Sequence, residues 1–336
     1  MDKLNGIFII PTGLGAAIGG DASCLAHVNL IAKCSNILLA NPNAVNASDL
    51  NTMADNVWYT EGSTIDRFLT GKINLQQTNT HNKVLCVVNK PITPGNINSI
   101  NASKWVLGAN IHLIALETPL ILESFLNEDG SAGGNVIGWE SLVEQVKDLD
   151  FDILTVQTPI TCNTELANKY WAGEILVNPW GAVESKLSKL VSVALNKQCV
   201  HSPIEFLQDN LYNKTVVKIS QAPEIISNCY SHCMFKGSHR APKIDIHKKV
   251  TNMSNSEIGF MVSPMNCWGT PHDACLENNI PIVIVKENTT CYKEFQYSNK
   301  ALTSDNVIFV ENYLEAAGVI MSLNAGIYWK TIRLTN

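Results

Sequence analysis

The sequence predicts an α/β protein built from mainly parallel, doubly wound sheets, arranged as two Rossmann-like subdomains that share a cleft. Short apolar runs of strand length alternate along the chain with segments whose apolar residues recur near the helical period. This alternation is typical of parallel sheets that are covered by helices. In addition, three apolar runs end in glycine-containing turns that open helices, at residues 11–21, 178–184 and 264–273.

The first part of the chain is expected to form the N-terminal subdomain, residues 1–135. Apolar runs predict strands over residues 6–10, 36–40, 57–59, 83–89 and 111–117, and helical periodicity predicts helices over 21–34, 46–54, 63–69 and 95–107. Residues 127–135 are rich in glycine and acidic or amide side chains and offer no core residues. We expect a loop there that ends the subdomain.

The C-terminal subdomain is expected over residues 136–336. Helices are predicted over residues 139–149, 163–171, 183–195 and 223–235, and strands over 152–157, 175–177, 258–263, 281–285 and 307–310. Strand and helix therefore continue to alternate to the end of the chain.

Composition excludes several classes of function. The chain has 336 residues, of which 46% are hydrophobic and 16% charged, with a formal net charge of -6. We therefore expect neither nucleic acid nor a membrane as partner, because no basic footprint, like-charge run or membrane-length apolar stretch is present. Ten irregularly spaced cysteines indicate a reducing compartment, so a cytoplasmic location is predicted. The low charged fraction also suggests buried subunit contacts, as in a homodimer.

The opening turn carries most of the functional prediction. Its glycines allow close approach of backbone N–H groups to a ligand, and a helix start favours an anion such as phosphate or carboxylate. The same glycines also fit a tight turn that binds nothing. The candidate ligand-binding residues are Thr12, Gly13, Gly15, Gly19, Gly20 and Asp21. The dinucleotide fingerprint fails, because Ile18 replaces its third glycine and Asn41 stands near the expected acidic position. This disfavours a nicotinamide-dependent oxidoreductase.

The second turn offers candidates for acid–base chemistry. Glu184 falls in the first turn of a predicted helix. There its carboxylate either interacts favourably with the helix dipole or faces a ligand as general base. Asn178 is a candidate to orient the same ligand. His201 follows the next apolar run and is expected at the same end of the sheet, either as a catalytic group or as a satisfied structural histidine.

The third turn adds a histidine at a helix start. Thr270 suits the N-cap, Pro271 the first helical position, and Asp273 the third. His272 has no such structural explanation and is therefore a catalytic candidate. Gly269, Thr270 and Asn288 are the candidate ligand contacts of this region, because Asn288 follows the next strand and ligands bind outside the carboxyl ends of strands.

No metal site is expected. Cys229, His232 and Cys233 lie close together, but a structural zinc site usually shows two regularly spaced ligand pairs. We expect these residues to lie at the end of a helix.

Several stretches together resemble the uncharacterised bacterial and algal family known as domain of unknown function 3326. They are Ile-Pro-Thr-Gly-Leu-Gly-Ala (10–16), Ile-Gly-Gly-Asp (18–21), Asn-Pro-Asn (41–43), Val-Asn-Ala (45–47), Glu-Gly (61–62), Asp-Arg-Phe (66–68), Asn-Pro-Trp-Gly (178–181) with Glu184, Gly-Thr-Pro (269–271), Ile-Pro (280–281) and Glu-Asn (287–288). The resemblance covers nearly the whole chain and implies one shared architecture, without a reaction.

These observations favour an enzyme that acts on a small anionic metabolite, phosphorylated, nucleotide-linked or carboxylate, with transferase chemistry as the leading class. Glu184, His272 and His201 are its catalytic candidates. No cofactor is assigned, although a nucleotide fits the glycine-rich turn. The alternative from another class is a non-catalytic ligand-binding or scaffold protein, which would bind without turnover.

Overall fold

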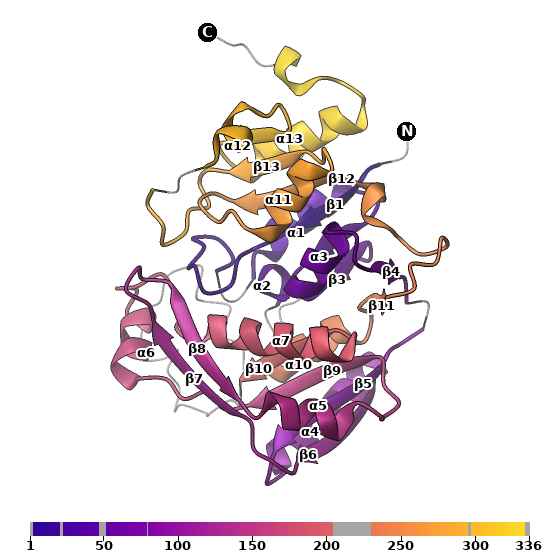
Figure 1. Ribbon diagram of the computed structural model, residues 1–336, viewed down its shortest axis with the longest axis vertical. Helices are drawn as coiled ribbons and strands as arrows, with labels where there is room; N and C mark the ends of the chain where they lie inside the picture. The colour runs from indigo at the N-terminus through magenta and orange to yellow at the C-terminus, as the bar shows by residue number, and fades with distance from the viewer. Residues whose placement is uncertain are drawn as a thin grey trace.

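The computed structural model describes residues 3–20, 23–46, 52–78, 80–203, 230–294 and 297–332. A six-stranded parallel sheet has the order β14 (Val307–Val310), β13 (Ile282–Val285), β12 (Ile258–Pro264), β1 (Asn5–Phe8), β2 (Leu38–Ala40) and β3 (Val57–Tyr59). A four-stranded parallel sheet has the order β10 (Cys199–Pro203), β9 (Ile153–Thr158), β5 (Lys83–Asn89) and β6 (Asn110–Leu116). The predicted α/β class is therefore confirmed (Figure 1).

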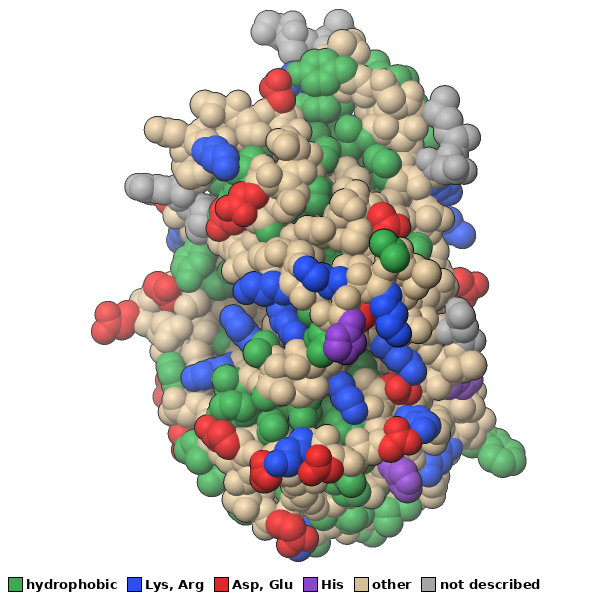
Figure 2. Space-filling model, turned by 45° about the vertical axis from the view of Figure 1, so that its right-hand side comes forward, with side chains coloured by type: hydrophobic (Ala, Val, Ile, Leu, Met, Phe, Trp, Pro, Cys, Tyr) green, Lys and Arg blue, Asp and Glu red, His purple; other side chains and the backbone are tan. Residues whose placement is uncertain are grey.

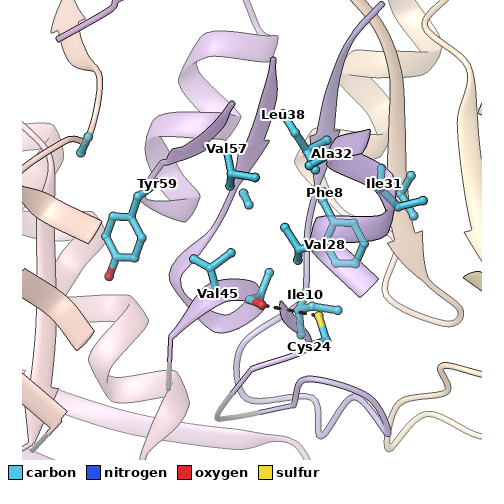
Figure 3. Packing of buried hydrophobic residues seen from close by; sticks show 14 of the residues in the cluster. Phe8, Ile10, Cys24, Val28, Ile31, Ala32, Leu38, Val45, Val57 and Tyr59 are labelled. Carbon is cyan, nitrogen blue, oxygen red and sulfur yellow. Dashed lines mark hydrogen bonds between the residues drawn. The ribbon is translucent and has the colours of Figure 1, made fainter. Parts of the chain in front are cut away.

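Helices cover both faces of the first sheet. Neighbouring strand residues point to opposite faces, so that Phe8 packs with α1 (Leu25–Lys33) and α13 (Tyr313–Asn324), whereas Ile7 packs with α3 (Gly62–Leu69) and α11 (Thr270–Glu277). Figure 3 shows the first of these two cores, in which Phe8 lies among Val28, Ile31 and Ile10. Smaller helices of this half are α2 (Pro42–Val45) and α12 (Asn299–Thr303).

The second sheet is covered in the same way. Leu85 and Val156 pack with α5 (Trp139–Val146) and α7 (Gly181–Leu195) on one face. Val84 and Cys86 pack with α4 (Pro94–Leu107) and α10 (Tyr230–Ser238) on the other. The remaining elements are α6 (Thr164–Trp171) and the 3-10 helices η2 (Asn255–Glu257) and η3 (Trp329–Ile332).

The expected boundary between residues 135 and 136 does not match these sheets. It falls inside β8 (Ala132–Ile137), and each sheet takes strands from both sides of it. The first sheet combines the beginning and the end of the chain, and the second sheet is formed by residues 83–203 between them. The physical reason is that β1 pairs with β12 as well as with β2, which joins segments about 250 residues apart.

Four short antiparallel strands were not predicted. Residues 127–135, expected as a loop, lie largely in a hairpin between β7 (Ile121–Leu126) and β8. β4 (Asn74–Gln76) pairs with β11 (Lys243–Asp245). Residues 175–177, predicted as a strand, form none. The predicted helix 46–54 lies partly outside the described ranges, and residues 52–54 are not helical. The predicted helix 223–235 is described only from residue 230, where α10 begins.

The two sheets meet along α3 and α7. Thr64 of α3 and Ser192 of α7 have their hydroxyl oxygens 3.4 Å apart. Beside them, the backbone N–H of Glu61 donates to the Gln198 side chain at 2.7 Å, and Gln198 donates onward to the Pro242 carbonyl at 2.6 Å. Residues just after β3 are thus bonded to residues just before β10, which brings polar groups from the two sheets together.

Candidate functional site

The glycines of the opening loop are packed against other protein atoms. Gly13 has φ +77°, and a Cβ there would lie 2.8 Å from the Ala182 side chain at the start of α7. Gly15 has φ +62°, and its Cβ would lie 2.8 Å from the backbone of Leu176. A Cβ at Gly19 would likewise be too close to Cys24, and a Cβ at Gly20 would be too close to the Ala16 carbonyl. The turn therefore needs glycine for conformation and packing, and anion binding by its backbone stays a prediction.

Asn288 fastens this loop. Its Oδ1 accepts the Ile18 N–H at 2.8 Å, while its Nδ2 donates to the Ile18 carbonyl at 3.0 Å and to the Tyr313 hydroxyl at 2.7 Å. Asn288 is fully buried. The expected ligand contact is thus a structural amide in this conformation, and it ties residues after β13 to the loop after β1.

We expect Asn288→Ala to lower the free energy of unfolding by about 1–3 kcal/mol, because it leaves buried backbone groups of Ile18 without partners. Tyr313→Phe removes only one of the three hydrogen bonds and should cost about 0.5–1.5 kcal/mol. Urea denaturation of both variants measures the difference. Equal losses would show that the bonds to Ile18 do not hold the loop.

The three glycine-containing turns lie close together in the structure. The opening loop contacts the second turn where Gly13 approaches Ala182. It also contacts the segment after β13, because the Ala17 N–H donates to the Thr289 carbonyl at 2.8 Å. The third turn joins the same region, because the Met265 N–H donates to the Asn288 carbonyl at 3.0 Å. Thr12 is half-buried at the start of the loop. Asp21 lies outside the described residues.

Two predicted catalytic residues, Glu184 and His201, contact each other. Glu184 lies in the first turn of α7, and His201 lies on β10 near the carboxyl end of the second sheet. The His201 Nδ1 and Glu184 Oε1 atoms are 2.9 Å apart. The His201 side chain is fully buried, whereas 21% of the Glu184 side chain is exposed. The carboxylate is therefore the member of the pair that solvent reaches.

A third residue, Thr158, completes a chain of hydrogen bonds. Its hydroxyl lies 3.0 Å from His201 Nε2, and Thr158 is fully buried at the end of β9. Sequence reasoning missed it because the predicted strand ended one residue earlier. The available signal was its place after a buried strand, where polar side chains gather in parallel sheets.

The partners determine how the proton is arranged on His201. An ionised Glu184 only accepts hydrogen bonds, so Nδ1 of His201 carries a hydrogen and donates it. When the imidazole is neutral, Nε2 then accepts the hydroxyl hydrogen of Thr158. This fixes the tautomer and the ring orientation, and it holds the carboxylate of Glu184 in one position.

Tyr59 reaches the same region from the first sheet. It lies at the end of β3, and Figure 3 shows its ring pointing away from the core residues around Val28. A Cβ at Gly237 of α10 would come within 2.3 Å of this ring, so the two are in close contact. The Tyr59 hydroxyl donates to Asn46 at 3.2 Å. Burial raises the pKa of Tyr59, and the negative charge of Glu184 adds to the rise.

Asn178 organises the turn before α7. It is buried, and its Oδ1 accepts the Trp180 N–H at 3.0 Å. The N-cap residue of α7, Trp180, makes no side-chain hydrogen bond to the N–H groups of the first turn. The positive end of this 15-residue helix, with Glu184 in its first turn, is thus a candidate position for an anion.

His272 does not fit the expected acid–base role. It is buried, its Nδ1 accepts the Gly269 N–H at 3.2 Å, and its Nε2 lies 2.9 Å from the Ser263 hydroxyl. Its ring also stacks on Trp268. Burial lowers the pKa of His272 to about 3, so the imidazole is neutral near pH 7. These contacts make His272 a structural side chain that closes the third turn.

The start of α11 also differs from the prediction by one residue. Gly269 is the N-cap and Thr270 the first helical residue, so that His272 occupies the third position expected for Asp273. Asp273 instead accepts the Trp268 Nε1–H at 2.8 Å. Neither Gly269 nor Thr270 is bonded to the Glu184–His201–Thr158 chain within the described part of the structure.

The predicted failure of the dinucleotide fingerprint has a structural counterpart. Asn41, at the end of β2, accepts the Ile10 N–H at 2.9 Å and donates to the Ile10 carbonyl at 2.8 Å. Its amide is thus used within the protein and is not directed to a ribose. Among the described residues, no group of three or more His, Cys, Asp or Glu side chains is arranged to hold a metal ion.

Fold and site together define an α/β protein with two parallel sheets and a His–carboxylate–hydroxyl chain at the carboxyl end of the second sheet. The chain belongs to the family described as protein of unknown function (DUF3326), whose model matches residues 5–333. It is 24% identical over 344 residues to an uncharacterized lipoprotein of Synechococcus sp., with 97% of this chain and 92% of that protein covered. No solved structure matches the chain. Within the described ranges, no helix is both long and apolar enough to cross a membrane.

Proposed function

We propose that this protein is an enzyme in which Glu184 acts as a general base toward a small anionic metabolite. The observation that carries the proposal is the Glu184–His201–Thr158 chain, in which a partly exposed carboxylate is backed by a buried imidazole. A positioned carboxylate of this kind accepts a proton from a reacting group in the transition state. His201 and Thr158 are positioning residues, because neither is exposed to a ligand.

The anionic substrate follows from the place of Glu184. The N-cap residue of α7 makes no side-chain cap hydrogen bond, and the first turn presents the positive end of the helix dipole. A phosphate or carboxylate of the substrate would bind there and place its reacting group beside Glu184. A phosphorylated, nucleotide-linked or carboxylate metabolite meets this requirement, with transferase chemistry as the proposed class.

The test combines a ligand screen with two matched variants. Nucleotides, sugar phosphates and organic acids are screened by thermal shift, where a ligand at 100 times its Kd adds about 2.7 kcal/mol of stability. For a ligand that is turned over, Glu184→Gln should keep the thermal shift and lower kcat about 10²–10⁴-fold, because only the base is lost. Glu140→Gln, also in the first turn of a helix and exposed, is the control and should leave kcat unchanged.

Two variants of Thr158 distinguish a role in positioning His201 from a role in packing. Thr158→Ser keeps the hydroxyl and should keep kcat, whereas Thr158→Val should lower kcat with little change of KM. If Glu184→Gln and Glu140→Gln are equally active, Glu184 is not the base.

A non-catalytic ligand-binding or scaffold protein is the second candidate. The burial of Thr158 and His201 favours it, because a fully satisfied buried network also serves to fix one conformation. This candidate predicts saturable binding without turnover, unchanged by Glu184→Gln.

We also propose that the protein is cytoplasmic and homodimeric. The mostly buried free cysteines of the described residues support a reducing compartment. The Synechococcus relative is named a lipoprotein, and protease accessibility distinguishes the two locations. Protease added to intact cells should leave a cytoplasmic protein uncut.

A further inference from the structure

The loop after β11 is held in a fixed shape by Asp245. Its buried carboxylate accepts the N–H groups of His247 at 2.9 Å and Lys249 at 2.7 Å, and the Asn252 side-chain amide at 2.8 Å. Lys248 at the centre has φ +50°. The carboxylate therefore forms the inner side of a tight turn, and the side chains between residues 246 and 250 are directed outward.

This turn exposes aliphatic side chains next to lysines. Val250 is fully exposed and 46% of Ile246 is exposed, while Lys248 and Lys249 between them are also exposed. The loop projects from the side of the molecule beside β11 (Figure 1). Two exposed aliphatic side chains therefore lie on one preorganised turn, beside two exposed lysines.

The lysines of the turn continue a basic surface on α3 and α7. Lys248 Nζ donates to the Gly71 carbonyl at 3.3 Å, which places it at the C-terminal end of α3. One helical turn before Gly71, Arg67 donates to Asn196 at the end of α7 at 2.6 Å. We define the basic surface by Arg67 on α3, Lys72 after it, Lys189 of α7, which acts electrostatically on Asp66 of α3, and Lys248 and Lys249 of the turn. Figure 2 shows Lys and Arg side chains gathered across the middle of this side of the molecule.

Acidic side chains offset only part of this charge. Asp66 lies next to Lys189 and is half-buried, and burial raises its pKa to about 6, so it stays mostly ionised at neutral pH and offsets one of the positive charges. Asp245 is turned inward to hold the loop. A protein with a net charge of -6 thus carries a local positive surface with an aliphatic edge.

We propose that the basic surface and the 246–250 turn bind an anionic phospholipid surface. Lysine and arginine side chains are attracted to anionic headgroups, and aliphatic side chains at the edge of the surface enter the boundary with the acyl chains. Single-stranded nucleic acid fits less well, because its binding sites add aromatic side chains for base stacking, whereas Ile246 and Val250 offer none. This proposal departs from the expectation that a membrane is not a partner.

The test is sedimentation of the full chain with lipid vesicles. Binding is expected to vesicles of phosphatidylcholine with phosphatidylserine, and not to phosphatidylcholine alone. Each basic side chain near such a surface contributes about fivefold in partitioning, so Lys248→Glu with Lys249→Glu should lower binding at least ~25-fold. Val250→Ser should lower it several-fold, because it removes the inserted aliphatic group. High salt should release the protein.

The control is Lys104→Glu on α4, an exposed lysine of a helix that packs on β6 and α10. It should bind like the wild type, and thermal melts of all variants show whether they fold. Equal binding to neutral and anionic vesicles, no binding to either, or binding that the paired Lys248 and Lys249 reversal leaves unchanged would overturn the proposal. So would tighter binding to a single-stranded oligonucleotide that Val250→Ser does not affect.

Discussion

Gly15→Ala is expected to lower the free energy of unfolding by about 2–5 kcal/mol. A non-glycine residue at φ +62° costs about 1–2 kcal/mol, and overpacking against the Leu176 backbone costs about 1–3 kcal/mol more. The Leu176 backbone lies between α6 and α7 and cannot turn away as a flexible side chain would. Urea denaturation, analysed as a two-state transition, measures the loss.

Gly62→Ala is the matched control. Gly62 lies in α3 without positive φ, and its Cβ would meet nothing within 4 Å. Alanine should therefore leave stability unchanged or raise it by about 0.4–1 kcal/mol. If Gly15→Ala were as stable as Gly62→Ala while a screened ligand lost affinity, the loop would have to open in solution, and its glycines would be kept for the ligand.

Most strands of the two parallel sheets could be predicted from the sequence. Continuous apolar runs such as residues 84–88 and 282–285 predict buried parallel strands, because both faces of such a strand are covered. The pairing of β1 with β12 was out of reach, since periodicity reports local structure and not which distant strands meet. The hairpin of β7 and β8 was missed because Gly133 and Gly134 read as loop residues, whereas a Cβ at either would meet Phe125 or Val183.

The candidate site was predicted in part. The first turn of a predicted helix selected Glu184 and the end of an apolar run selected His201, and the structure brings the two side chains to 2.9 Å. The same argument selected His272, but a position at a helix start does not reveal that the ring is buried between Trp268 and Ser263. The basic surface was invisible in the sequence, because its residues come from separate segments that only the packing of α3 on α7 and the 246–250 turn brings together.

Acidification below pH 6.5 is expected to destabilise the protein through its buried neutral histidines. Burial lowers the pKa of His272 from 6.5 to about 3, and burial lowers that of His239 to about 4. Above pH 6.5 neither the folded nor the unfolded chain protonates these rings. Between pH 6.5 and the folded values, the unfolded chain binds protons that the folded chain does not, so stability falls as pH falls.

The expected slope is up to ~1.4 kcal/mol per pH unit for each such histidine, once the pH is well below 6.5. His272→Asn should lose stability at pH 7.5, because Ser263 and Gly269 lose a partner, yet show a shallower decline between pH 6.5 and 4.5 than the wild type. His112→Asn, an exposed histidine on β6, is the control and should keep the full slope. Denaturant midpoints across this pH range measure both. Equal slopes of stability against pH in the two variants would contradict the prediction. The His272 ring would then become protonated in the folded protein despite its burial.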